Sequence, residues 1–475
     1  MTTTDMVRKI AIGLAEALPG CKVVSVGGSV RDAIINANTL SKEDLITSFN
    51  QYPKDFDLEV FGTHPPLVKL ALKEYLGLEV ELVGRHFPVY KVKGWDIDIA
   101  FPRKETKTGP KHTDFIVDCD PNMSFEEASL RRDFRFNAIG YDWVTDVILD
   151  PHHGLDDIRD RVMDPVSEKF KEDALRVLRA FKFIARYGFK PSVKTIEYCK
   201  NMIEELKAYP RERVAEEWHD FIFNGKAEHV SEAFQFLKVA GASELYPEIF
   251  DLDEVLQDPQ HHPEGKVGVH RDLCLYHFMH SVRNMLENDE ERLIVGYAVL
   301  THDFGKATET RIEDGKLIAH GHEDSPLARK FMERLMDPAD IRIDQIEKLV
   351  KSHMRPVILY KAKAGSSAVR RLVRSVDGRI DRLFKVVECD QNGRYPRLAD
   401  YSAIYWLNDE VNKLGIKEKE TIKPIIKGRH IIEHLKLNSS PRFGEILNQI
   451  FEAQLDGKFL DEAGGIEYLK QNYKT

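Results

Sequence analysis

Residues 22–40, KVVSVGGSVRDAIINANTL, decide the fold of the N-terminal part of the chain. An apolar run at 22–26 has the length of a short buried strand, Gly27, Gly28 and Ser29 interrupt it, and helix-forming residues follow at once. A strand, a glycine turn and a helix N-terminus in this order leave backbone N–H groups able to bind a phosphate group. A glycine pair by itself more often marks a plain tight turn, so the surrounding sequence has to decide.

Further strand patterns surround this turn. Short apolar or alternating runs typical of strands occur in CKVVSV, FDLEVFG, LEVELVG, PVYKVKG and WDIDIAF. Beyond about residue 165 an apolar spacing of three and four predicts helices, as in ALRVLRAFKFIARYGF. The sequence thus predicts an α+β N-terminal part with a mixed sheet, followed by mostly α-helical regions. Prolines and glycines at 255–266 predict a boundary between two helical blocks.

Composition sets limits on the class of protein. A chain of 475 residues exceeds a single core and predicts about three domains. No apolar run approaches the roughly 20 residues of a membrane span, and the N-terminal stretch is typical of an amphipathic helix rather than a secretory signal, so we expect a cytoplasmic protein without membrane contact. The net charge of −9 means that an RNA partner must meet a local basic surface. The five cysteines are scattered singly, which predicts packing residues rather than disulfides.

Two carboxylates follow the turn. In KDFDLEVFG, Asp55 and Asp57 are two residues apart on a predicted strand, so both side chains point to one face, about 7 Å apart. Such a pair repels itself unless a cation lies between the two groups, and Mg²⁺ prefers oxygen ligands of this kind. A solvated strand face explains many isolated pairs with this spacing.

Together, GGSVRD (27–32) and KDFD (54–57) resemble the signature of the DNA polymerase beta superfamily. Four further motifs resemble, in order and spacing, those of class II tRNA nucleotidyltransferases and their poly(A) polymerase relatives: FPRKE (101–105), EEASLRRDFRFNAIGYD (126–142), DPHHGLDDI (150–158) and EDALRVLRAFKFIARYGF (172–189). The resemblance covers about residues 20–215 and implies a polymerase beta-like nucleotidyltransferase head.

The resemblance also implies residue roles. Asp55 and Asp57 would hold catalytic Mg²⁺, with Asp98 of WDIDIAF as a third acid. The nucleotide would be bound by the turn and by ribose and phosphate contacts: Gly27, Gly28, Ser29, Arg31, Arg131, Arg132, Asp133 and Asn137. Arg135 departs from the family pattern, which usually has threonine there.

Residues 172–176, Glu-Asp-Ala-Leu-Arg, resemble the EDxxR element by which these enzymes select bases without a nucleic-acid template. We expect Asp173 to accept a hydrogen bond from the exocyclic amine of C or A, and Arg176, at i+3 on the same helical face, to donate to the neighbouring ring atom. Uracil and guanine present a carbonyl oxygen instead, and the resulting unpaired charge costs on the order of 1–3 kcal/mol. Elsewhere such a pair would be a surface ion pair. The same resemblance assigns Glu172, Arg179 and Arg186 to this surface and Arg211, Glu212 and Arg213 to a following neck element.

Histidines next to acids recur after residue 265, in VGVHRDL, VLTHDFGKA, IAHGHEDSP, VKSHMRP and ECDQNGR. Imidazole and carboxylate together are good ligands for divalent metals. The set resembles the HD phosphohydrolase superfamily, which implies a site for Mn²⁺, Ni²⁺, Co²⁺ or Mg²⁺ with these ligands: His270, His302, Asp303, His322, His353 and Asp390. His277 and His280 are rivals of His270, and Lys306 is a candidate for binding substrate phosphate. A solitary histidine of this kind would usually be a core residue.

We therefore expect a nucleotidyltransferase head (1–140), a neck (141–215), a helical body (216–262), an HD domain (263–395) and a C-terminal helical region (396–475). The expected function is addition of C, C and A to tRNA from CTP and ATP, with phosphoester hydrolysis at the HD site. A flexible loop at 101–124 favours full addition. The alternatives are a poly(A) polymerase, a partial enzyme adding only C or only A, and an RNA-binding regulator in which only the HD domain is active.

Overall fold

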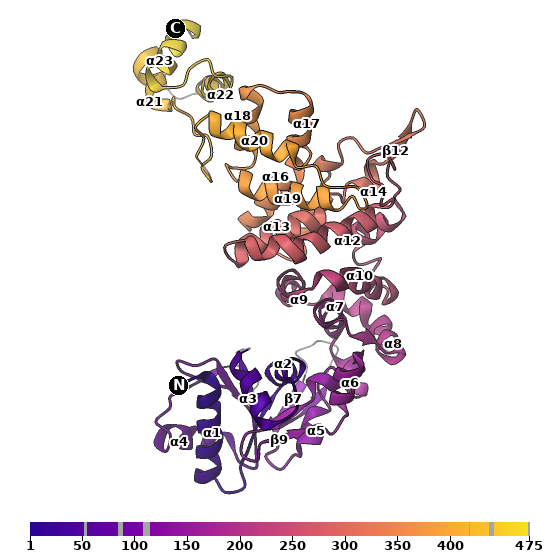
Figure 1. The fold of residues 1–475 in the computed structure, drawn as a ribbon. Coiled ribbons are helices and arrows are strands. Elements are labelled where there is room, and N and C mark those ends of the chain that lie inside the picture. The colour runs from indigo at the N-terminus through magenta and orange to yellow at the C-terminus, as the bar shows by residue number, and fades with distance from the viewer. Residues whose placement is uncertain (52–54, 84–88, 108–114, 418, 437–440, 474–475) are drawn as a thin grey trace. The chain divides into compact units, whose positions relative to one another are not determined.

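The computed structural model describes residues 1–51, 55–83, 89–107, 115–417, 419–436 and 441–473 (Figure 1). Its N-terminal part combines a mixed sheet with helices, and almost all that follows is helical. The predicted fold class is therefore confirmed. In the part of the chain that is described, the structure contains no helix with the length and apolar character needed to cross a membrane.

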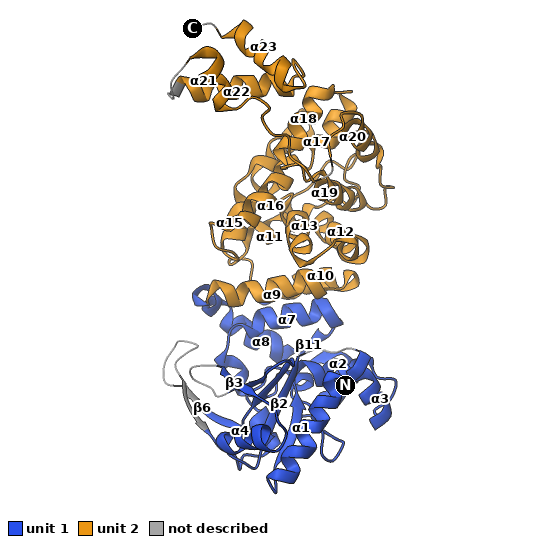
Figure 2. Ribbon diagram, turned by 90° about the vertical axis from the view of Figure 1, so that its left-hand side faces the viewer, with its two compact units in different colours: residues 1–209, 239–241 blue, residues 210–238, 242–475 orange. Residues whose placement is uncertain are grey.

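Two compact units make up the chain (Figure 2). Unit 1 comprises residues 1–209 with 239–241, and unit 2 comprises 210–238 with 242–475. The five-segment division expected from the sequence remains a prediction. Residues 255–266, where we expected a boundary, lie inside unit 2, and a bridge joins Leu256 to Lys266.

A seven-stranded sheet organises unit 1, in the order β3-β4-β5-β2-β1-β8-β9. Only the central pair β2–β5 is parallel; the other neighbours are antiparallel. All five predicted strands are present in it. The strands are β1 (Lys22–Val26), β2 (Phe56–Phe61), β3 (Val80–Val83), β4 (Val89–Val92), β5 (Ile97–Ala100), β8 (Gly140–Asp142) and β9 (Val147–Leu149).

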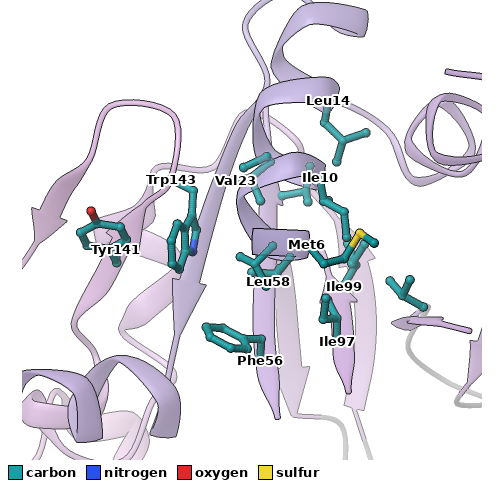
Figure 3. Packing of buried hydrophobic residues seen from close by; sticks show 14 of the residues in the cluster. Met6, Ile10, Leu14, Val23, Phe56, Leu58, Ile97, Ile99, Tyr141 and Trp143 are labelled. Atoms are coloured by element: carbon teal, nitrogen blue, oxygen red, sulfur yellow. The ribbon is translucent and has the colours of Figure 1, made fainter. Parts of the chain in front are cut away.

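Side chains that alternate between the two faces of the strands build the core on one face of the sheet. In β2 and β5 the apolar residues point to the buried face, and helix α1 (Thr3–Ala17) covers it with Met6, Ile10 and Leu14 (Figure 3). A capping box between Thr2 and Asp5 starts this helix. Because the apolar residues of β2 are fixed in the core, Asp57 and Glu59 must lie on the opposite face.

Seven more α-helices belong to unit 1: α2 (Gly28–Asn36), α3 (Lys42–Gln51), α4 (Pro65–Glu74), α5 (Phe125–Ser129), α6 (Gly154–Asp160), α7 (Arg176–Tyr187) and α8 (Val193–Met202). The predicted loop at 101–124 contains two paired strands, β6 (Arg103–Lys107) and β7 (Phe115–Cys119), and its residues 108–114 lie outside the described part. Lys54 of the KDFD motif lies outside it as well.

In the described part of unit 2, all regular elements are helices except one hairpin. Its strands β12 (Arg311–Glu313) and β13 (Lys316–Ile318) were not predicted, although the intervening Asp314-Gly315 is a strong hairpin signal and both residues have positive φ. Its longer helices are α9 (Arg211–Asn224), α10 (Val230–Val239), α12 (Val267–His277), α13 (Asp289–Thr301), α16 (Ile341–Ser352), α18 (Ser366–Ser375), α19 (Ile380–Asn392), α20 (Ser402–Lys413), α21 (Gly428–Leu435), α22 (Pro441–Leu455) and α23 (Glu462–Asn472).

Candidate functional site

The glycine turn lies against the carboxylates of β2. Gly27 caps helix α2 with a φ of 73°, a conformation that favours glycine. A Cβ atom at this position would lie 3.5 Å from Oδ2 of Asp57 and 3.6 Å from Nη1 of Arg132. The turn, the acid and the arginine therefore border one small space at the N-terminus of a helix, a place that suits a phosphate group.

Three carboxylates gather beside this turn. Asp57 stands opposite Asp98 across the parallel pair β2–β5, and Asp55 immediately precedes β2 rather than lying inside it. Burial on one side raises the pKa of Asp57, and the negative charges of Asp98, Asp55 and Glu59 raise it further against the effect of Arg132. Oδ1 of Asp98 is buried and has no hydrogen-bond partner among the described residues. A buried carboxylate oxygen without a partner, beside two more acids, fits a divalent cation.

Glu59 is a site residue that the sequence reasoning missed. It follows Asp57 on the same strand face and is only 1% exposed. Its two oxygens pair with Arg131 at 2.9 Å and Arg132 at 3.5 Å. Burial opposes its ionisation, but the two arginines keep the pKa of Glu59 below its ordinary value. Glu59 thereby holds both predicted phosphate contacts beside Asp57. The alternation Asp55, Asp57, Glu59 was the available signal.

We expect Glu59→Gln to lower the free energy of unfolding of unit 1 by about 2 kcal/mol at neutral pH, because two partly buried guanidinium groups lose their counter-charge. Since the folded pKa lies below the unfolded value, the wild type loses this stabilisation as the pH falls below about 4.5, so the difference between the proteins should narrow in acid. Urea unfolding at several pH values measures this difference in the free energy of unfolding. The control is Glu79→Gln, an exposed partner of Lys93, which should change little.

Several predicted nucleotide contacts bind one another in a buried network. The guanidinium of Arg31 donates to Asp32, to Oδ1 of Asn137 at 2.8 Å and to the hydroxyl of Tyr187 at 2.8 Å. Nδ2 of Asn137 donates to Asp133, which also accepts from Arg179 at 2.7 Å. The network connects α2 to α7. In this structure, then, Arg31, Asp133 and Asn137 have protein partners where we expected ribose and phosphate.

Three other residues singled out in the sequence also have protein partners. The hydroxyl of Ser29 is buried and reaches the carbonyl of Val26 at 3.5 Å. Arg135, the departure from the family pattern, forms a fork with Asp157, with bonds of 3.0 and 2.5 Å. Burial raises the pKa of Asp157 to about 6 despite this partner. Arg186, predicted to face the nucleotide, pairs with Asp32 at 3.2 Å.

The predicted base-selecting residues come together, but not on one helical face. Asp173 has extended backbone after a short 3-10 helix, and α7 begins only at Arg176, so that expectation is wrong. Arg176 donates to the carbonyls of Lys169 at 2.7 Å and Arg131 at 2.6 Å. The negative charges of Asp133, Asp173 and Glu172 all act on it. Through Arg176, the base-selecting residues are therefore hydrogen-bonded to the backbone of Arg131, whose side chain pairs with Glu59.

Tyr209 is a second missed residue. Its hydroxyl donates to Oδ1 of Asp173 at 2.8 Å and accepts from the N–H of Ala174 at 3.0 Å. The N–H of Leu175 also donates to Oδ1, at 3.0 Å. No sequence motif links a tyrosine with an acid 36 residues earlier. Arg211, the first residue of α9, instead donates to the carbonyl of Met336 within unit 2.

All six predicted ligands of the second site meet in unit 2, and each is at most 6% exposed. Nε2 of His322 lies 3.1 Å from Asp303, that of His302 3.4 Å and that of His353 4.0 Å. His270 lies 3.1 Å from Asp390 and 3.7 Å from Asp303. The Nε2 atoms of His302, His322 and His353 and Oδ1 of Asp303 have no partner with hydrogen-bond geometry in the described part of the chain. Buried donor atoms that converge without bonding one another fit a metal site.

Hydrogen bonds from Nδ1 to backbone carbonyls fix the orientation of three of the imidazole rings. Nδ1 of His302 donates to the carbonyl of Val299 at 2.8 Å, and Nδ1 of His322 and of His353 donates likewise to the carbonyl three residues earlier, at 2.7 and 2.6 Å. This fixes the tautomer that offers Nε2 to a metal. Burial lowers the pKa of His353 to about 3, so this ring is neutral, as ligation requires.

Further charged residues surround the cluster. Glu264 accepts from Nδ1 of His262 at 2.8 Å and lies 2.7 Å from Nδ1 of His270, which also bonds to the carbonyl of Gly393. Burial opposes its charge, yet the two histidines hold the pKa of Glu264 at about 2. Lys306 contacts Asp303 at 2.8 Å, and Arg394 contacts Asp390 at 2.6 Å. A cavity of about 440 Å³ opens beside the cluster. It is lined by Lys306, Arg394, Asp303, His322, His353 and Asp390, among others.

His277 and His280, the alternatives to His270 as a ligand, make other contacts. His277 pairs with Glu388 at 3.3 Å, and His280 is exposed and stacks on Tyr276. Among the described residues, neither belongs to a group of potential metal ligands. Sequence reasoning missed His262, Glu264 and Cys274, although His262 and Glu264 precede His270 closely in the chain.

Residues 23–164 match the protein family described as the Poly A polymerase head domain. This span holds the glycine turn and the three carboxylates. Fold and site together define a metal-dependent nucleotidyltransferase. The multifunctional CCA protein of Aromatoleum aromaticum is 31% identical over 80% of this chain and 86% of its own, and that of Acinetobacter baumannii 29% over 90% and 98%. The chain belongs to this family, the multifunctional CCA proteins.

Solved structures share the fold. The Bacillus stearothermophilus CCA-adding enzyme in complex with CTP superposes with a TM-score of 0.64 at 20% identity, covering 99% of this chain and 98% of its own. The Thermotoga maritima CCA-adding enzyme complexed with tRNA gives a TM-score of 0.55 at 19% identity, covering 98% and 94%.

Proposed function

We propose that this protein adds C, C and A to the 3′ end of tRNA, taking CTP and ATP as substrates. The observation that carries this proposal is the group of Asp55, Asp57 and Asp98 beside the glycine turn, joined through Glu59 to a surface suited to reading bases. The relatives are multifunctional CCA proteins, and the similar structures include CCA-adding enzymes in complex with CTP, ATP and tRNA, which supports the proposal.

In the proposed reaction the tRNA 3′-hydroxyl attacks the α-phosphate and pyrophosphate leaves. Asp55 and Asp57 would hold Mg²⁺, with Asp98 as a third ligand, and the metal would supply positive charge at the hydroxyl and the phosphates. The turn at Gly27 and Gly28 offers backbone N–H groups to the triphosphate. Arg131 and Arg132 are both held by Glu59, and Arg132 borders the turn, where its positive charge suits a phosphate group.

Base selection would rest on Asp173 and Arg176. The carboxylate of Asp173 can accept from the amine of C or A but opposes the carbonyl oxygen of U or G. Arg176 donates to two backbone carbonyls, and these two bonds fix the orientation of its guanidinium group. Tyr209 and the N–H of Leu175 orient one oxygen of Asp173, so the carboxylate presents a fixed acceptor geometry.

We expect Tyr209→Phe to reduce discrimination against UTP and GTP about tenfold, because one hydrogen bond to a charged group is worth somewhat more than 1 kcal/mol. The measurement is kcat/KM for each triphosphate with a tRNA ending in CC. Tyr198→Phe, which removes a hydroxyl bonded to Glu168, is the matched control. Unchanged rejection of UTP and GTP would count against a role for Tyr209 in selection.

The choice between full and partial addition is tested with tRNA transcripts. Three transcripts, ending at the discriminator base, after C and after CC, are incubated with each labelled triphosphate. Full CCA addition predicts incorporation of CTP into the first two and of a single ATP into the third. Repeated ATP addition would indicate a poly(A) polymerase instead, and incorporation at one stage alone a partial enzyme. No incorporation at any stage would favour the RNA-binding regulator.

For unit 2 we propose an HD-type phosphohydrolase. Its six ligands would hold Mn²⁺, Ni²⁺, Co²⁺ or Mg²⁺, and the metal would supply a Lewis acid to a phosphoester. Lys306 and Arg394 line the cavity and suit a phosphate group. We further propose a cytoplasmic location, and a division of the chain into head (1–140), neck (141–215), body (216–262), HD domain (263–395) and C-terminal region (396–475).

A further inference from the structure

Cys274 faces the metal-site histidines of unit 2. It follows His270 by one turn of α12 and is fully buried. Its Sγ lies 3.4 Å from Nε2 of His270. One potential ligand atom each from His270, Cys274 and His302 lies within 4.8 Å of the others. These neighbours distinguish Cys274 from the apolar packing residue that the sequence predicts.

A second observation points to a ligand at the same place. His302 is 2% exposed, and its Nε2 makes no hydrogen bond to any described residue, whereas its Nδ1 is bound to the carbonyl of Val299. A buried ring nitrogen that makes no hydrogen bond is costly unless a cation occupies the space before it.

The backbone nearby leaves room for this arrangement. A Cβ atom on Gly393, at the end of α19, would lie only 2.4 Å from Sγ of Cys274 and 3.0 Å from Nδ1 of His270. Only glycine therefore fits at this position without displacing the thiol or the imidazole. The end of α19 therefore packs directly on the pair.

We propose that Cys274 is a thiolate ligand of the metal held by His270 and His302. Metal–sulfur and metal–nitrogen bonds of about 2.3 and 2.0 Å at a tetrahedral angle place the two ligand atoms about 3.5 Å apart, close to the observed separation of 3.4 Å. The thiol proton passes to solvent as the metal binds. A thiolate favours zinc, cobalt or iron over magnesium. The inference rests on the proposed metal site of unit 2 and adds a ligand to it.

Cobalt spectroscopy tests the ligand directly. The full chain, stripped of metal, receives one equivalent of Co²⁺ in the presence of excess Mg²⁺. We expect a near-ultraviolet thiolate-to-cobalt charge-transfer band together with visible ligand-field bands. Cys274→Ser should lose the charge-transfer band and weaken cobalt binding at least about tenfold. Cys199→Ser removes a buried thiol of α8 in unit 1 and should retain the band.

The possible outcomes separate the two proposals. Ligand-field bands without the charge-transfer band in the wild type would overturn the role of Cys274 while leaving the metal site in place. Absence of bound cobalt would overturn both. Should Cys274→Ser fail to fold, X-ray absorption of the cobalt-loaded wild type decides: a sulfur neighbour at about 2.3 Å supports the proposal, and nitrogen and oxygen neighbours alone refute it.

Discussion

Asp57→Asn is expected to slow nucleotide addition by about 10³-fold, the equivalent of roughly 4 kcal/mol in the barrier. Asparagine keeps the shape of the side chain and removes the charge that a metal requires. Because Asp57 lies on the solvent-facing side of β2, away from the apolar core, the fold should be retained. The measurement is single-turnover addition of labelled CTP to a tRNA transcript that ends at the discriminator base.

The same variant tests the independence of the two sites. The phosphoester hydrolysis that we propose for unit 2 should be unchanged, because the six proposed ligands all come from that unit. Asp160→Asn, which alters an exposed partner of Arg159, is the control and should preserve addition. Equal loss of both activities in Asp57→Asn would contradict the assignment of separate metals.

Asp303→Asn should weaken metal binding by unit 2 at least about 100-fold and lower hydrolysis correspondingly. Asp303 lies within 4.0 Å of four of the histidines, so its charge acts at the centre of the cluster. The measurement is metal content after dialysis against a weak chelator, with nucleotide addition as a second readout that should not change.

Its matched control is Asp377→Asn. Asp377 is an exposed partner of Lys348 in the same unit and has a positive φ that asparagine tolerates. Circular dichroism of both variants verifies the helical fold. Full metal retention by Asp303→Asn would remove the proposed site.

Local sequence was sufficient for much of unit 1. Strand length and alternation predicted β1, β2 and β5, and the glycine turn could be placed because only a short strand-to-helix connection fits residues 22–40. The register of Asp57 followed from the burial of its neighbours Phe56 and Leu58. The proposed ligands of unit 2 were named from the resemblance to the HD phosphohydrolase superfamily, to which the recurring histidines next to acids pointed.

Side-chain partners across distant elements were not predictable. Arg31 and Asn137 are 106 residues apart, and only the folded packing of α2 against the segment before β8 makes them partners. The break before α7 arises because the short 3-10 helix ends at Glu172 and leaves Asp173 extended, which helical spacing alone does not reveal. Tyr209 reaches Asp173 through tertiary packing, so no spacing rule could identify it.

Three imidazoles in unit 2 are each anchored by a main-chain oxygen of their own turn, at Val299, Ala319 and Val350. A main-chain anchor survives almost any substitution, because every residue type carries the same carbonyl. The orientation of these rings is consequently unaffected by substitutions in the cavity wall, where Lys316, Ile358 and Lys361 lie. Substitutions at those wall positions would therefore change which phosphoester the proposed site accepts without altering the nitrogen atoms that it offers to a metal.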